Sequence, residues 1–177
     1  TRMIWRTPDA PLDFGSVASK LLTGEQSNSN IAYGDKLLIK VLRRVQPGVN
    51  PDVELGRYLS QEAGIESVPR LLADWSLHTP SGEASLGIAQ AFVPGAEDGW
   101  QWLLDQLNKA GSNPALRPAI EAEIRQLGAR TAEIHNALAA ASDPDIAPAA
   151  ITESDTAVWR TSTRAMLTGL LPSVKAA

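Results

Sequence analysis

The pattern of hydrophobic residues changes once along the chain, at Pro94-Gly95, and this change constrains the fold more than any other feature of the sequence. Before it, short apolar runs separated by turn residues indicate β-strands, and after it apolar residues recur at helical spacing. Strands followed by helices are typical of the α+β class. We therefore expect two parts, residues 1–93 with an antiparallel sheet plus one helix, and residues 94–177 with helices only.

A β-hairpin is predicted around the dipeptide Gly34-Asp35, which separates residues 30–33 from the apolar run at residues 37–42. Two further strands are expected near residues 71–77 and 86–93. The turn residues between them, Thr79 to Gly82, include a proline that presets φ and a glycine that permits a positive φ.

One helix is predicted between the two strand pairs. Asn50 can cap it, Pro51 suits its first position, and Asp52 and Glu54 place negative charge at the positive end of the helix dipole. Gly64 should end it.

Three helices are predicted in the second part, at residues 99–109, 116–141 and 153–171, the last ending before Pro172. The longest carries apolar residues at helical spacing, which predicts a stripe facing the core. The residues of this stripe are Leu116, Ile120, Ile124, Leu127, Ile134 and Leu138.

Composition excludes several classes of protein. With 177 residues, 44% of them hydrophobic, and a formal net charge of −4, the chain is typical of a globular domain, not of a disordered or collagen-like one. It has no cysteine and two histidines, so no disulfide framework and no metal site are expected. The acidic balance argues against nucleic-acid binding. No apolar run approaches the roughly 18 residues that cross a bilayer, so no membrane association and a cytoplasmic location are expected.

The chain begins at Thr1 and ends at Lys175-Ala176-Ala177 without a closing motif. We expect it to be a piece of a longer protein. The alternative is that only a few residues have been removed.

Lys40 lies within the apolar run of the predicted hairpin. Side chains alternate between the two faces of a strand, so Lys40 shares one face with Leu38 and Leu42, and the other face is apolar as well. An unpaired buried ammonium group is costly, so Lys40 should meet an anion, either Glu54 of the following helix or the phosphate of a ligand. The alternative is an edge strand from which Lys40 extends to water while Glu54 pairs with Arg57.

A short polar segment, Gly-Glu-Gln-Ser-Asn-Ser-Asn at residues 24–30, precedes this strand pair. Small side chains let backbone N–H groups and hydroxyls approach phosphate oxygens closely. The segment is not a Walker A loop, and an ordinary solvated turn is the alternative. The order of loop, strand lysine and helix glutamate is that of a kinase small lobe.

The sequence resembles the maltokinases, bacterial kinases with an aminoglycoside-phosphotransferase-like fold that are often fused to trehalose synthase. The resemblance rests on four runs, Gln26 to Asn30, Gly34 to Lys40, Arg43-Arg44 and Pro47 to Glu54, and continues at residues 90–94, 98–100 and 127–135.

This resemblance implies residues that bind ATP. They are Gln26, Ser27, Asn28 and Ser29 in the loop over the phosphates, Lys40 at the α- and β-phosphates with Glu54 as its helix partner, and Gln90 and Phe92 in the hinge that binds adenine. Kinases of this family carry a His-Gly-Asp loop and an Ile-Asp-Phe-like turn after the long helix, and neither occurs here. We therefore expect no catalytic residue and no metal ligand within this chain, the ligands of Mg²⁺ lying outside it.

By the same resemblance, the chain is expected to be part of an ATP-dependent sugar kinase that phosphorylates maltose to maltose 1-phosphate in trehalose and glycogen-type glucan metabolism. Residues 1–93 would form a kinase-like, nucleotide-binding small lobe, and residues 94–177 the hinge exit and an incomplete helical large lobe. ATP and a disaccharide would be the ligands, and trehalose synthase a fusion or partner. The alternative is a non-catalytic nucleotide-binding or regulatory module. A nucleic-acid module using Lys36, Arg43 and Arg44 together with Lys40 is disfavoured, because Lys40 points into an apolar face.

Overall fold

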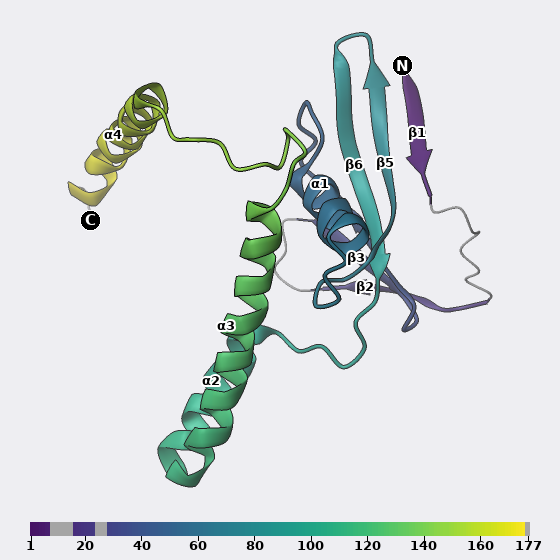
Figure 1. Ribbon diagram of the computed structural model, residues 1–177. Helices are drawn as coiled ribbons and strands as arrows, with labels where there is room; N and C mark the ends of the chain where they lie inside the picture. Colours follow the sequence, from purple (N-terminus) through teal and green to yellow (C-terminus); the bar gives the residue numbers. More distant parts are fainter. Residues whose placement is uncertain (8–15, 24–27, 176–177) are drawn as a thin grey trace.

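Six antiparallel strands form a single sheet in the computed structural model, which describes residues 1–7, 16–23 and 28–175 (Figure 1). The strands are β1 (Arg2–Arg6), β2 (Ser19–Leu22), β3 (Ser29–Tyr33), β4 (Leu37–Val41), β5 (Leu71–Thr79) and β6 (Gly82–Ala91). Their order across the sheet is β1-β5-β6-β4-β3-β2, so β6 and β4 lie in the middle. With the helices described below, this sheet confirms the predicted α+β class.

Both predicted hairpins are present. Strands β3 and β4 pair on either side of Gly34, whose φ of 54° requires the freedom of glycine, and β5 pairs with β6 across the turn that ends at Gly82. The sequence analysis did not identify β1 and β2. These strands pair with β5 and β3 at the two edges of the sheet, and each has only four or five residues, too few for alternation to be a clear signal.

Helix α1 (Pro51–Arg57) begins where the sequence predicts, with the side chain of Asn50 accepting a hydrogen bond from the backbone of Asp52 at 2.9 Å. It continues as a π-helical turn, η1 (Tyr58–Glu62), and the chain turns at Gly64 with φ 65°. Val53 is buried against Leu71 and Ile88 of the sheet, which fixes the face of α1 that contacts the strands.

Three helices and a short 3-10 turn follow the sheet. They are α2 (Gly99–Ser112), η2 (Pro114–Leu116), α3 (Arg117–Ala139) and α4 (Glu153–Lys175). Helix α2 runs three residues beyond its predicted end, because the first terminating signal is Asn113, which adopts an extended backbone. The predicted end of α4 before Pro172 is wrong, since the helix continues to Lys175. A proline removes only one backbone donor, so a helix can continue past it when the neighbouring residues stay helical.

The predicted apolar stripe of α3 is buried only in part. Ile134 and Leu138 pack against Tyr58, Leu59 and Ala141, and Ile120 is 8% exposed. The other three members are exposed by 37% to 67%: Leu116, Ile124 and Leu127. The reason is that only the C-terminal half of α3 reaches η1, while its other half extends away from the sheet beside α2 (Figure 1).

No helix in the described ranges combines the length and the apolar character needed to cross a membrane. Within those same ranges, no cluster of three or more His, Asp or Glu side chains could hold a metal ion.

Candidate functional site

Lys40 lies on β4, between β3 and β6. Its register neighbours are Asn30 on β3 and Ile88 on β6, and its side chain is 27% exposed. Residues directly opposite one another in a sheet share a face, so Lys40 points to the side on which Val53 of α1 packs against Ile88. The interior position predicted for Lys40 is confirmed, and the alternative of an edge strand is wrong.

The partner of Lys40 is Asp52. Its carboxylate oxygen Oδ2 lies 3.7 Å from Lys40 Nζ, whereas Glu54 forms no ion pair among the described residues. The expected pair between Lys40 and Glu54 is therefore corrected. An ion pair with this separation, between side chains that are 27% and 45% exposed, contributes at most about 1 kcal/mol to the free energy of unfolding. Such a pair orients the ammonium group without a hydrogen bond, so the N–H donors of Lys40 are available to another anion.

The rotation of α1 explains why Asp52 and not Glu54 meets Lys40. Val53 faces the sheet, and successive helical residues are about 100° apart, so Asp52 and Glu54 lie on opposite flanks of the helix. Arg57 lies about 40° from Val53 on the same flank as Glu54, and it reaches Asp74 on β5. The other flank, with Asp52, therefore faces β4.

Asp74 is another charged group on this face. It pairs in register with Ile88, so one row across the sheet carries Asn30, Lys40, Ile88 and Asp74. The sequence analysis missed Asp74 and Asn30. The signal for Asp74 was the same as for Lys40, a charged residue inside an apolar strand.

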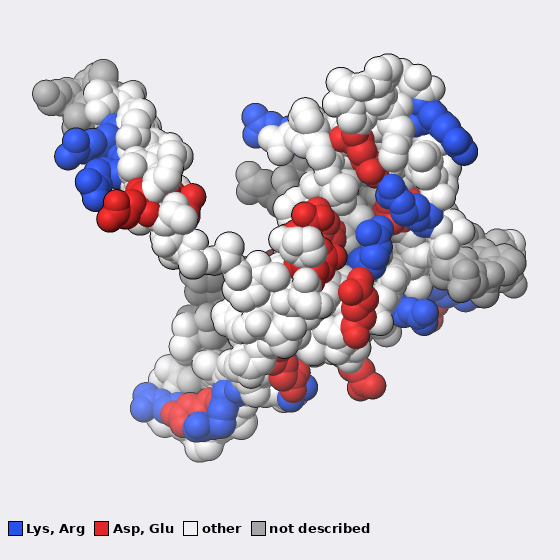
Figure 2. Space-filling model, turned by 45° about the horizontal axis from the view of Figure 1, so that its top comes forward, with Lys and Arg blue, Asp and Glu red and all other residues white. Residues whose placement is uncertain are grey.

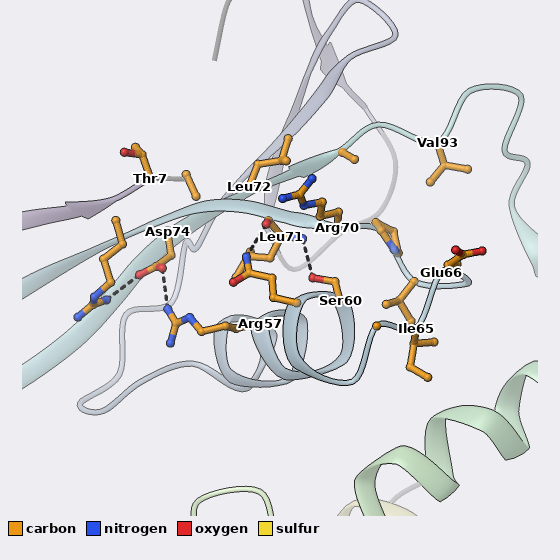
Figure 3. A pocket seen from close by; sticks show the side chains of 17 residues that line it. Thr7, Arg57, Ser60, Ile65, Glu66, Arg70, Leu71, Leu72, Asp74 and Val93 are labelled. Atoms are coloured by element: carbon orange, nitrogen blue, oxygen red, sulfur yellow. Dashed lines mark hydrogen bonds and ion pairs between the residues drawn. The ribbon is translucent and has the colours of Figure 1, made fainter. Parts of the chain in front are cut away.

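Two arginines hold the buried carboxylate of Asp74, whose side chain is 5% exposed. Arg6 of β1 donates from Nη1 to Oδ1 at 2.7 Å, and Arg57 of α1 donates from Nη2 to Oδ2 at 2.8 Å (Figure 3). A buried carboxylate needs such partners, because desolvation otherwise disfavours its charge. Asp74 thus joins the edge strand β1 and the helix α1 to β5.

Arg6 also binds Glu83 on β6, donating from Nη2 to Oε1 at 2.8 Å, and His78 Nε2 lies 3.2 Å from the same oxygen. The hydrogen bond from Arg6, followed by one from Ser76, lowers the pKa of Glu83 to about 2. The hydrogen bonds to Glu83 and then Asp74 raise the pKa of Arg6. Glu83 and Arg6 therefore stay ionised over the physiological range.

We expect Glu83→Gln to lower the free energy of unfolding by about 1–2 kcal/mol at pH 7. This is less than the free energy that corresponds to the whole shift in the pKa of Glu83, because solvent screens the partly exposed Arg6. The folded pKa of about 2 lies below the ordinary value of 4.5, so this stabilisation is present above pH 4.5 and is lost as the pH falls toward 2. Urea unfolding at several pH values measures it, with Glu121→Gln on the exposed surface of α3 as the control. A deficit that is the same at pH 7 and pH 3 would contradict this assignment.

The four residues predicted to cover the phosphates are only partly described. Gln26 and Ser27 lie outside the described residues. Asn28 is half-buried, directly before β3, and Ser29 lies opposite Val41. Because Val41 and Lys40 are on opposite faces of β4, Ser29 is on the face away from Lys40. Asn30, directly opposite Lys40, is the polar residue of this strand that shares its face.

The two predicted hinge residues lie at the end of β6. Gln90 pairs with Leu38 in register and shares the face of Lys40, and Phe92 follows the strand. The backbone N–H groups of Ala91 and Phe92 donate to Arg70 at 2.9 Å and Lys36 at 3.1 Å, so both are used within the fold. The N–H of Val93 makes no hydrogen bond among the described residues, so it is the first free backbone donor after β6, and Pro94, which follows it, has no N–H.

A groove of about 1130 Å³ lies on the β5 side of the sheet, beside η1 and residues 64–70 (Figure 3). Arg57 and Asp74 line one end, and Glu66 and Val93 the other. Lys40 and Gln90 do not line it, so it lies apart from the region around Lys40 that is predicted to bind phosphate, although Asp74 belongs to the same sheet face. Figure 2 views one face of the molecule. On this face, Lys and Arg side chains are interspersed with Asp and Glu, and no broad area carries charge of a single sign.

The chain is similar in sequence to known sugar kinases. It is 28% identical over 183 aligned positions to a glucosamine kinase of Streptacidiphilus jiangxiensis, covering 97% of this chain and 40% of that protein. It is 26% identical over 143 positions to a glucosamine kinase of Mycolicibacterium smegmatis, covering 78% of this chain and 33% of the relative. The chain thus spans at most two fifths of the length of these relatives. No protein-family model matches it.

Solved structures of glucosamine kinases share its fold. One superposes with a TM-score of 0.70 at 22% identity, over 97% of this chain and 39% of the other. A structure described as a glucosamine kinase in complex with glucosamine, ADP and inorganic phosphate superposes with a TM-score of 0.65 at 24% identity, over 97% of this chain and 39% of that one. These similarities are to sugar kinases in general, and none of these relatives is named a maltokinase.

Proposed function

We propose that this chain is the nucleotide-binding part of an ATP-dependent sugar kinase. The observation that carries the proposal is Lys40 on the interior strand β4, oriented by a weak ion pair with Asp52 of the following helix. This arrangement presents an ammonium group with unused donors on a partly covered sheet face. The similarity of the chain to glucosamine kinases supports the same function.

In the proposed complex, Lys40 binds phosphate oxygens of ATP. A charge-assisted hydrogen bond is stronger than a neutral one, and the half-buried setting of Lys40 strengthens it further. Gln90 lies on the same face, two residues beyond Ile88, and the free backbone donor of Val93 is the nearest candidate for the adenine edge. Residues 1–93 are proposed as a kinase-like small lobe and residues 94–177 as the start of a helical lobe.

Magnesium is the usual counterion of ATP in phosphoryl transfer. Among the described residues, no three acidic or histidine side chains cluster, and Mg²⁺ in such sites is held by one or two carboxylates together with the phosphates of the substrate. The ligands of Mg²⁺ are proposed to lie outside this chain, so we expect no sugar phosphorylation by this chain alone. The second candidate is a nucleotide-binding or regulatory module without chemistry.

For the acceptor, the names of the relatives favour glucosamine over maltose. The resemblance to maltokinases had favoured maltose and a trehalose synthase partner, and neither has support from the relatives. We propose a hexose-type sugar as the acceptor class. A coupled assay of ADP release by the protein that contains this chain, with glucosamine and maltose offered in parallel, separates the two.

The proposed function is tested by calorimetric titration of this chain with ADP and with adenosine. We expect ADP to bind about tenfold or more tightly, because only ADP offers phosphate oxygens to Lys40. Inorganic pyrophosphate is a third probe, and it should compete with ADP but not with adenosine. Equal affinities for ADP and adenosine, or no binding of either, would contradict a phosphate site at Lys40.

A further inference from the structure

We propose that Arg57 and Asp74 are positioning residues of the phosphate site. Their buried ion pair fixes the rotation of α1 about its own axis and so holds Asp52 beside Lys40, 3.7 Å from its ammonium nitrogen. This inference rests on the proposed function, and it adds two residues that neither the sequence pattern nor the relatives assign to the site.

The need for such a device follows from how little of α1 is buried. The helix has seven residues, and Val53 is its buried residue, 1% exposed against Leu71 and Ile88. Within α1, one apolar contact fixes how closely the helix approaches the sheet but resists its rotation little. The following turn η1 is tied to β5, since the N–H of Leu71 donates to Ser60 Oγ at 3.0 Å and Gln61 Nε2 donates to the carbonyl of Leu71 at 2.8 Å, so the restraint still needed is on α1 itself, where Asp52 lies. At the start of α1, the backbone N–H of Asn50 donates to Ser85 Oγ at 2.9 Å, which holds the position of this end.

Arg57 supplies a restraint within α1 itself. It lies about 40° around the helix from Val53 on the flank toward β5, whereas Asp52 lies about 100° around on the flank toward β4. A tether from Arg57 to Asp74 at 2.8 Å therefore opposes any roll that would lift Asp52 away from Lys40. Figure 3 shows Arg57 extending from the helix to Asp74 on the strand above it.

The relative strengths of the two pairs point the same way. Asp74 is 5% exposed and makes short hydrogen bonds, whereas Lys40 and Asp52 are 27% and 45% exposed and 3.7 Å apart. Pairs of the first kind are costly to break, and exposed pairs contribute little. The pair of Arg57 with Asp74 therefore sets the helix position, and the pair of Asp52 with Lys40 follows from it.

The chain offers a matched control in Arg6. This arginine donates to the other oxygen of the same carboxylate at 2.7 Å, but it belongs to β1. Its side chain is 39% exposed, close to the 37% of Arg57. Arg6→Gln and Arg57→Gln thus each remove one charged donor from Asp74, and only the second releases α1.

The test compares ADP and adenosine binding to the full chain, by calorimetry, for a set of variants. We expect Arg57→Gln to weaken ADP binding about fivefold, Arg57→Lys to recover part of that loss, and adenosine binding to stay unchanged. Arg6→Gln should lower the midpoint of thermal unfolding at least as much as Arg57→Gln, because it also loses the hydrogen bond to Glu83, but it should change ADP binding less than about twofold. Asp52→Asn, at an exposed position that does not threaten folding, should reproduce the loss of Arg57→Gln.

A double variant decides whether the effect passes through Lys40. In the Lys40→Met background, Arg57→Gln should cause no further loss of ADP affinity. Three results would overturn the inference. They are equal losses of ADP affinity in Arg6→Gln and Arg57→Gln, normal ADP affinity in Asp52→Asn, and a loss of ADP affinity on Arg57→Gln that is undiminished in the Lys40→Met background. Failure of the proposed function is a different result, in which the unaltered chain does not prefer ADP to adenosine.

Discussion

Lys40→Met is expected to weaken ADP binding to this chain by about 1–3 kcal/mol, which is about five- to 150-fold in the dissociation constant. The reason is that methionine fills nearly the same volume between Asn30 and Ile88 but offers phosphate no donor and no charge. The side chain of Lys40 is 27% exposed, and its ion-pair partner among the described residues is the weakly bound Asp52, so removing the ammonium group leaves no buried charge without a partner. The variant should therefore fold normally.

Adenosine separates this effect from a general disturbance of the site. Its affinity should change by less than about twofold in Lys40→Met, since a base and ribose offer no anion to the ammonium group. Lys36→Met is the matched control for the loss of a positive charge, because Lys36 is an exposed residue in the turn before β4. It should leave both ligands unaffected. Equal losses for ADP and adenosine in Lys40→Met would give Lys40 a structural role instead.

The sequence sufficed to predict Lys40 on an interior strand, because alternation and the surrounding apolar run are local signals. The partner of Lys40 could not be predicted in the same way. Asp52 and Glu54 are both acidic residues in the first turn of α1, and the choice between them depends on how the helix is rotated. That rotation depends on contacts of Val53 and Arg57 with residues of β5 and β6, which are distant in the sequence.

Two other differences have the same origin. β1 pairs with β5 about seventy residues later, and neither its length nor its pattern signals that pairing. The apolar stripe of α3 correctly marks one face of the helix, but periodicity does not say which part of that face is covered. Ile134 and Leu138 pack against η1, whereas Leu127 is 67% exposed. The buried position of Asp74, in contrast, could have been predicted in the same way as that of Lys40, since both are charged residues inside apolar strands.

The second large effect is expected at Gly87, which lies on β6 between Val41 of β4 and Trp75 of β5. A Cβ atom at this position would lie 2.5 Å from the backbone oxygen of Lys40 and would overlap the ring of Trp75. Trp75 is itself stacked on Trp5, with ring centroids 5.2 Å apart. A side chain at Gly87 must therefore displace either the backbone of β4 or this aromatic pair.

We expect Gly87→Val to lower the free energy of unfolding by about 3 kcal/mol, at the upper end of the usual cost of overpacking, because one of the two clashes is with backbone. Gly128→Ala is the control, at a position in α3 where a Cβ meets nothing within 4 Å, and it should stabilise the chain by up to about 1 kcal/mol. Urea unfolding measures both. Adding Trp75→Ala to Gly87→Val should restore only part of the lost stability, because the backbone oxygen of Lys40 still clashes with the new side chain. Full recovery would mean that the whole clash is with the ring of Trp75. An unchanged free energy of unfolding in Gly87→Val would contradict the close approach of β6 to β4.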